Sequence, residues 1–87
     1  VMGLPGRGGY AELVEVDARR LTPLPDGLGY EQAASFAVTY GTGHVALAHR
    51  ARLRPGETLL VHGAAGGVGL TAVELGRIMG ARVIGTA

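Results

Sequence analysis

The residues best suited to chemistry form a glycine-rich run from His62 to Leu70. Gly66 and Gly67 carry no Cβ, so a pyrophosphate group could approach the backbone closely at these positions. Gly69 is expected to lie in the first turn of a helix and to let that helix pack tightly against the preceding strand. Because the start of a helix offers unpaired amides and the positive end of a dipole, the run predicts an anion-binding loop.

The run differs from the dinucleotide-binding pattern Gly-x-Gly-x-x-Gly, because Ala64 stands at the first glycine position. A tight strand-to-helix turn that binds nothing is therefore an open alternative. Two other chemistries lose support. No lysine follows the loop, as it would in a nucleoside triphosphatase, and the nucleophile pattern Gly-x-Ser-x-Gly of many hydrolases is absent.

The segments on either side of the run predict a βαβ unit. Residues Thr58–His62 are nearly all apolar and have the length of a strand buried on both faces. Residues Val68–Met79 place an apolar stripe at helical spacing, and Gly80 is a suitable helix stop. A second strand follows at Arg82–Thr86, which a right-handed crossover would make parallel to the first. Two strands and one helix leave an apolar sheet face uncovered, so we expect a piece of a longer protein.

The first half of the chain has weaker signals. Apolar and polar residues alternate over Tyr10–Val16, which predicts a strand. A short helix is predicted over Tyr30–Val38, with Glu31 in its first turn, and a second helix over Thr42–Arg50. The fold class is therefore α/β.

The end of the second predicted strand bears on the choice of cofactor. An acidic residue near this point usually holds the ribose hydroxyls of NAD, and it would repel the 2′-phosphate of NADP. Gly85, Thr86 and Ala87 are all uncharged, which favours NADPH. The alternative is an acidic residue one or two positions beyond Ala87.

The composition excludes several classes of function. Eight arginines and seven carboxylates give a net charge of +1, so no strong positive field would attract nucleic acid. No apolar run approaches the ~20 residues of a membrane span, and the absence of cysteine fits a cytoplasmic location.

The histidines do not predict a metal site. His44 and His49 are five residues apart, which would put them on different faces of an α-helix, and there is no cysteine ligand. His62 is expected to be a hydrogen-bonded residue that supports the loop. The arginines between positions 50 and 54 are expected to form a solvated helix end and turn.

The chain resembles the medium-chain dehydrogenases/reductases, and among them the zinc-independent quinone oxidoreductase branch. The resemblance covers nearly the whole chain, with one departure at Glu74, where the branch usually has Gln. The segments that carry it are Gly8–Glu12, Leu24–Leu28, Glu31–Ala34, Thr42 with His44–Leu47, Pro55–Glu57, Leu60–Gly63 and Ala65–Gly69.

The resemblance implies that residues 1–28 end a GroES-like catalytic domain, residues 29–54 form connecting helices, and residues 55–87 begin a Rossmann domain. It further implies hydride transfer from NADPH to a quinone or another electron-poor alkene or carbonyl, in a homodimer. An enoyl reductase acting on thioester-linked acyl chains and a non-catalytic NADPH-binding protein are the alternatives. The residues that it places against the cofactor are Thr42 at the nicotinamide and Ala65, Gly66, Gly67, Val68 and Gly69 at the phosphates.

Overall fold

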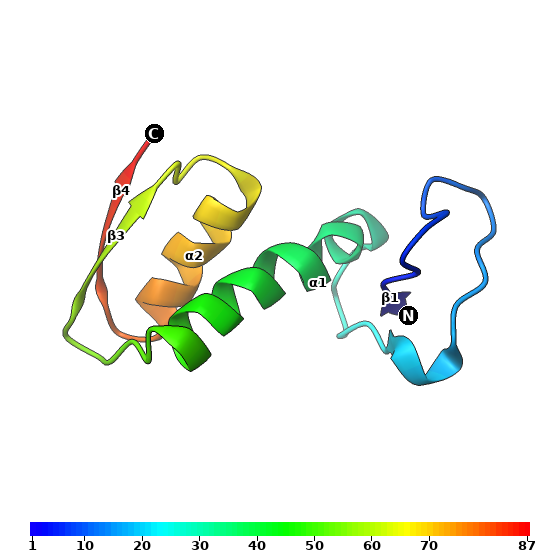
Figure 1. Ribbon diagram of the computed structural model, residues 1–87, viewed down its shortest axis with the longest axis horizontal. Helices are drawn as coiled ribbons and strands as arrows, with labels where there is room; N and C mark the ends of the chain where they lie inside the picture. Colours follow the sequence, from blue (N-terminus) through cyan, green and yellow to red (C-terminus); the bar gives the residue numbers. More distant parts are fainter. The chain divides into compact units, whose positions relative to one another are not determined.

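The computed structural model describes residues 1–87 and divides into two compact units, Val1–Ala37 and Val38–Ala87, which we describe separately (Figure 1). The domain boundaries expected after residues 28 and 54 stay a prediction. None of the helices combines the length and the apolar character needed to cross a bilayer. The elements in chain order are β1 (Met2–Gly3), η1 (Ala18–Arg20), β2 (Leu21–Thr22), α1 (Tyr30–His44), η2 (Val45–Arg50), β3 (Thr58–His62), α2 (Gly67–Ile78) and β4 (Arg82–Thr86).

The first unit contains little regular structure. β1 and β2 form a two-residue antiparallel pair, with Met2 opposite Thr22. The prediction of a strand over Tyr10–Val16 is wrong. This segment is irregular, and the side chains of Tyr10 and Leu13 are exposed. A strand is stable only when a neighbouring strand takes up its backbone N–H and C=O groups, and no strand of the described chain lies beside this segment.

The helical region is continuous, so the prediction of two separate helices is wrong. α1 runs past Val38 to His44, and η2 follows without a break. Gly41 does not interrupt the helix. The Thr42 hydroxyl donates a hydrogen bond to the carbonyl oxygen of Val38 at 2.6 Å, one turn earlier, as helical threonines often do.

The last six residues of this region form a π-helix, which the sequence did not predict. A π-helix has a wider turn than an α-helix, so residues five apart come onto one face. Accordingly, the rings of His44 and His49 lie edge to face with their centres 5.3 Å apart. The expectation that these two histidines occupy different faces is therefore wrong. The π-helix ends at Arg50, and two residues later Arg52 has a φ of 52°, the left-handed conformation that often follows a helix C-terminus.

The second unit contains the predicted βαβ unit. β3 and β4 are parallel and pair in register from Thr58 opposite Arg82 to His62 opposite Thr86. α2 connects them and ends where Gly80 adopts a φ of 82°. The predicted strands, helix and glycine stop are confirmed, and α2 covers the β3–β4 pair (Figure 1).

Close packing between α2 and the strands depends on a mid-helix glycine. A Cβ added at Gly76 would lie 2.7 Å from Leu59 Cδ2 and 3.0 Å from Val83 Cγ2. Leu60 and Ile84 alternate with these strand residues and stay 53% and 43% exposed. One apolar face is therefore uncovered, as expected, and β3 is not buried on both faces.

Candidate cofactor site

The glycine loop is held at both of its ends. β3 ends at His62, and Gly63 turns the chain with a φ of 69°, a conformation that favours glycine. The Ala64 N–H donates to the carbonyl oxygen of Thr86 at the end of β4, at 2.9 Å. The Gly66 N–H donates to the Gly63 carbonyl oxygen at 3.0 Å. These two bonds fix the loop against the carboxyl end of the parallel pair, where α/β proteins bind ligands.

The first turn of α2 leaves backbone donors free. The first hydrogen bond of the helix runs from the Leu70 N–H to the Gly66 carbonyl oxygen at 2.8 Å. The preceding amides of Gly67, Val68 and Gly69 have no acceptor in the chain. Three free N–H groups at the positive end of a helix dipole form an arrangement that can bind a phosphate oxygen.

Packing does not require glycine at two of these positions. A Cβ added at Gly66 would lie 3.4 Å from the Gly63 carbonyl oxygen, and one added at Gly67 would lie 3.5 Å from Thr39 Cγ2. Both distances are ordinary van der Waals contacts, and the φ of −78° at Gly66 suits any residue. The missing side chains therefore leave space beside the free amides, as close approach of a ligand requires.

Gly69 has a different role from the one predicted. A Cβ added there would lie 2.9 Å from the Gly63 carbonyl carbon and 3.0 Å from Ala64 Cα. Gly69 thus lets α2 sit directly on the loop, not on the strand. Gly76 provides the close contact with the strands. The sequence analysis missed that residue, although a glycine inside a predicted helix was a signal for it.

The predicted nicotinamide-side residue lies on α1. Thr42 is exposed, and its hydroxyl proton is donated to Val38, which leaves the oxygen lone pairs able to accept another hydrogen bond. Thr39, one helical turn earlier, is the α1 residue next to the loop. Its carbonyl oxygen lies 3.0 Å from the hydroxyl of Thr71, the buried polar residue of α2. The predicted phosphate-side residues Ala65–Gly69 lie together, across the loop and the start of α2.

A second contact between the helices involves two titratable groups. The Tyr40 hydroxyl of α1 donates a hydrogen bond to the Glu74 carboxylate of α2. This bond stabilises the protonated phenol and therefore raises the pKa of Tyr40, and desolvation and the charge of Glu74 act in the same direction.

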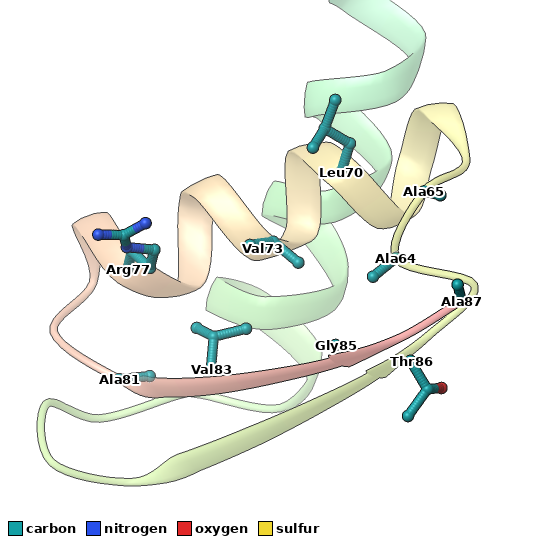
Figure 2. A pocket seen from close by; sticks show the side chains of 10 residues that line it. All are labelled: Ala64, Ala65, Leu70, Val73, Arg77, Ala81, Val83, Gly85, Thr86 and Ala87. Atoms are coloured by element: carbon teal, nitrogen blue, oxygen red, sulfur yellow. The ribbon is translucent and has the colours of Figure 1, made fainter.

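His62 is hydrogen-bonded, as expected. Its Nδ1 lies 2.9 Å from Oγ1 of Thr86, its register partner on β4. Both residues are exposed, and the Thr86 side chain points away from α2 (Figure 2). The pair ties the carboxyl ends of the two strands together immediately before the loop.

An open groove of about 560 Å³ lies beside the loop, between α2 and β4 (Figure 2). Leu70, Val73 and Arg77 line it along the helix, and Arg77 lies at the end away from Ala65. Arg77 is the one charged residue of the lining, which contains no acid. The groove therefore brings no negative charge to the end of β4, where Gly85, Thr86 and Ala87 are uncharged.

The other charged residues singled out in the sequence belong neither to the loop nor to the lining of the groove. Arg50, Arg52 and Arg54 are exposed along the end of η2 and the following turn. The Arg54 N–H donates to the Glu57 carboxylate at 2.8 Å. No group of three potential metal ligands occurs, and His44 and His49 remain a pair.

Comparison with known proteins places this geometry in context. No family model matches the chain. The quinone oxidoreductase of Mus musculus is 46% identical over 80 residues, which cover 92% of this chain and 24% of that protein. The crystal structure of the quinone oxidoreductase from Thermus thermophilus, which was also determined in complex with NADPH, matches 95% of this chain and 28% of its own, with a TM-score of 0.89 and 47% identity. This chain is a quinone oxidoreductase-like segment of the medium-chain dehydrogenase/reductase family.

The quinone oxidoreductase-like segment also matches proteins of other kinds. The polyketide synthase component PikAII of Streptomyces venezuelae is 49% identical over all of this chain, which covers 2% of that protein. The CurK enoyl reductase structure matches 83% of this chain and 22% of its own, with a TM-score of 0.77 and 35% identity. The chain spans about a quarter of the length of the curated quinone oxidoreductases that it matches. Its assignment to the zinc-independent branch stays a prediction.

Proposed function

We propose that the protein containing this chain is an NADPH-dependent oxidoreductase that transfers hydride to a quinone or another electron-poor alkene or carbonyl. The observation that carries the proposal is the loop between the two parallel strands, where three free amides lie beside glycines that packing does not require. The similarity to the Thermus quinone oxidoreductase, which was determined with NADPH, supports the same cofactor chemistry.

Each residue of the site would contribute binding or orientation. Ala65 and Gly66 would line the space for the pyrophosphate, and the N–H groups of Gly67, Val68 and Gly69 would donate to its oxygens. The free lone pairs of the Thr42 hydroxyl would accept an N–H from the nicotinamide carboxamide and so orient the ring. The bound cofactor supplies the hydride, and the protein orients the ring and excludes water.

The preference for NADPH rests on charge. Gly85, Thr86 and Ala87 place no carboxylate at the end of β4, and the groove beside it contains Arg77 and no acid. A carboxylate at this point would repel a 2′-phosphate, whereas these residues do not. We therefore expect tighter binding of NADPH than of NADH.

The test is a cofactor oxidation assay on the full-length protein with 1,4-benzoquinone as acceptor. We expect NADPH to be oxidised with a higher kcat/KM than NADH. Oxidation of NADH in preference to NADPH would contradict the cofactor assignment. Saturable NADPH binding with no turnover over a panel of quinones, enones and aldehydes would indicate the non-catalytic alternative.

A second candidate is an enoyl reductase that acts on thioester-linked acyl chains. The match of all of this chain to a small part of a polyketide synthase component and the structural match to the CurK enoyl reductase favour it. Crotonyl-CoA is the discriminating substrate. A kcat/KM for crotonyl-CoA well above that for 1,4-benzoquinone would identify an enoyl reductase, and the reverse ratio would identify a quinone reductase.

A further inference from the structure

The two helices that carry the proposed cofactor contacts meet along a narrow line of contacts, which we call the α1–α2 seam. It consists of Thr39, Tyr40 and Gly43 on α1, and of Thr71, Glu74 and Leu75 on α2. On each helix the outer two residues of the set are four apart, and such residues share one face.

The seam is closely packed and polar. A Cβ added at Gly43 would lie 3.0 Å from Leu75 Cδ1, so the glycine sets how closely the helices approach. The Thr71 hydroxyl lies 3.0 Å both from the carbonyl oxygen of Thr39 and from that of Val68 in its own helix. Across the seam, the side chains of Tyr40 and Glu74 form a hydrogen bond with each other.

The seam residues are close in sequence to both groups of proposed cofactor contacts. Thr42, at the proposed nicotinamide end, precedes the seam residue Gly43 on α1. The proposed phosphate donors form the first turn of α2, and Thr71 follows them directly. A sliding or rotation of one helix along the other would therefore change the distance between the nicotinamide contact and the phosphate contacts.

We propose that Tyr40 and Glu74 are positioning residues, which hold α1 and α2 in the register at which one NADPH molecule meets both Thr42 and the loop. The proposal rests on the proposed function. The Tyr40–Glu74 bond is the seam contact best suited to this task, because it is directional and joins a side chain of each helix, whereas the Thr71 hydroxyl bonds to a backbone carbonyl oxygen of α1. Tyr40 is half-buried and Glu74 is exposed, so a variant can remove the bond without opening a cavity in the core.

The variants follow from the atoms of the bond. Tyr40→Phe removes the donor and keeps the ring, and Glu74→Ala removes the acceptor. Glu74→Gln keeps an acceptor oxygen at the same distance along the side chain but removes the charge. Tyr30→Phe removes the hydroxyl of an exposed tyrosine in the first turn of α1 and serves as the matched control.

The experiment uses the full-length protein and three readouts: the Kd for NADPH, the emission spectrum of the bound nicotinamide, and kcat with 1,4-benzoquinone. For Tyr40→Phe and Glu74→Ala we expect a Kd within about twofold of wild type, because the loop still binds the phosphates. The bound emission should shift toward that of free NADPH. We expect kcat to fall about tenfold or more, since a displacement near 1 Å can lower a rate by 10²-fold.

Glu74→Gln and Tyr30→Phe should match the wild type in all three readouts. The double variant Tyr40→Phe/Glu74→Ala should be no worse than either single variant, because both remove the same bond. Wild-type emission and kcat in Tyr40→Phe would overturn the positioning role, as would failure of Glu74→Gln to retain wild-type kcat. Failure of the wild-type protein itself to bind NADPH would instead overturn the proposed function, and with it this inference.

Discussion

Gly69 offers a sharp test of how the loop and α2 fit together. In an open helix, replacing glycine by alanine stabilises by about 1 kcal/mol, because alanine loses less backbone entropy. At Gly69 the new Cβ would instead lie 2.9 Å from the carbonyl carbon of Gly63 and 3.0 Å from Ala64 Cα. Both neighbours are backbone atoms, so neither can move away by a change of rotamer.

The magnitude follows from the groups that must move. Overpacking costs about 1–3 kcal/mol, and displacing the loop weakens the Ala64–Thr86 bond, which contributes about 1 kcal/mol. After the gain in helix propensity is subtracted, Gly69→Ala should destabilise this region by about 2 kcal/mol. That free energy corresponds to a roughly 30-fold increase in the equilibrium constant for local opening.

Hydrogen exchange of the α2 and β4 amides, measured in the full-length protein, reports this local opening. We expect exchange in Gly69→Ala to be roughly 30-fold faster than in wild type. Gly66→Ala is the matched control: its Cβ makes an ordinary 3.4 Å contact, so exchange should stay at the wild-type rate while NADPH affinity falls. Slower exchange in Gly69→Ala than in wild type would refute the packing argument.

Three further predictions concern residues away from the loop. Gly41→Ala should stabilise α1 by about 0.5–1 kcal/mol, because nothing lies within 4 Å of the new Cβ; unchanged or faster amide exchange in α1 would contradict this. Arg52→Gly should raise the apparent Tm through a gain of about 0.5–1 kcal/mol, since Arg52 has a φ of 52°; a lower Tm would show that this conformation is not strained. The pKa of Asp17 is lowered below its ordinary value, chiefly by the side-chain hydrogen bond from Arg19 and also by the hydrogen bond from the Arg19 backbone N–H. The contribution of this contact to stability is therefore present at neutral pH and is lost as the pH falls through the lowered pKa. An NMR titration of the Asp17 carboxyl should show the pKa rise in Arg19→Ala, and an unchanged value would contradict the assignment.

The second half of the chain could be predicted from its sequence because its signals are local. The apolar run of β3, the helical spacing in α2 and the stop at Gly80 each depend on residues within the element itself. The parallel pairing then follows from the handedness of the crossover. The free amides were also predictable, since every helix start leaves such donors.

The errors arise where structure depends on distant partners or on small differences in helical period. An alternating pattern at Tyr10–Val16 specifies a strand only when another strand is present to pair with it. Over six residues, apolar spacing does not separate a π-helix from an α-helix, so the His44–His49 contact was missed. The role of Gly76 depends on Leu59 and Val83, which are remote in sequence.

The central claim is that the loop from Gly63 to Gly69 binds the phosphates of NADPH. The most direct measurement is amide hydrogen exchange of the full-length protein with and without saturating NADPH, with saturation followed by nicotinamide fluorescence. We predict that exchange slows at the free amides of Gly67, Val68 and Gly69 when NADPH binds, because phosphate oxygens would accept their hydrogen bonds. Saturation by NADPH with unchanged exchange at these three amides would contradict the claim.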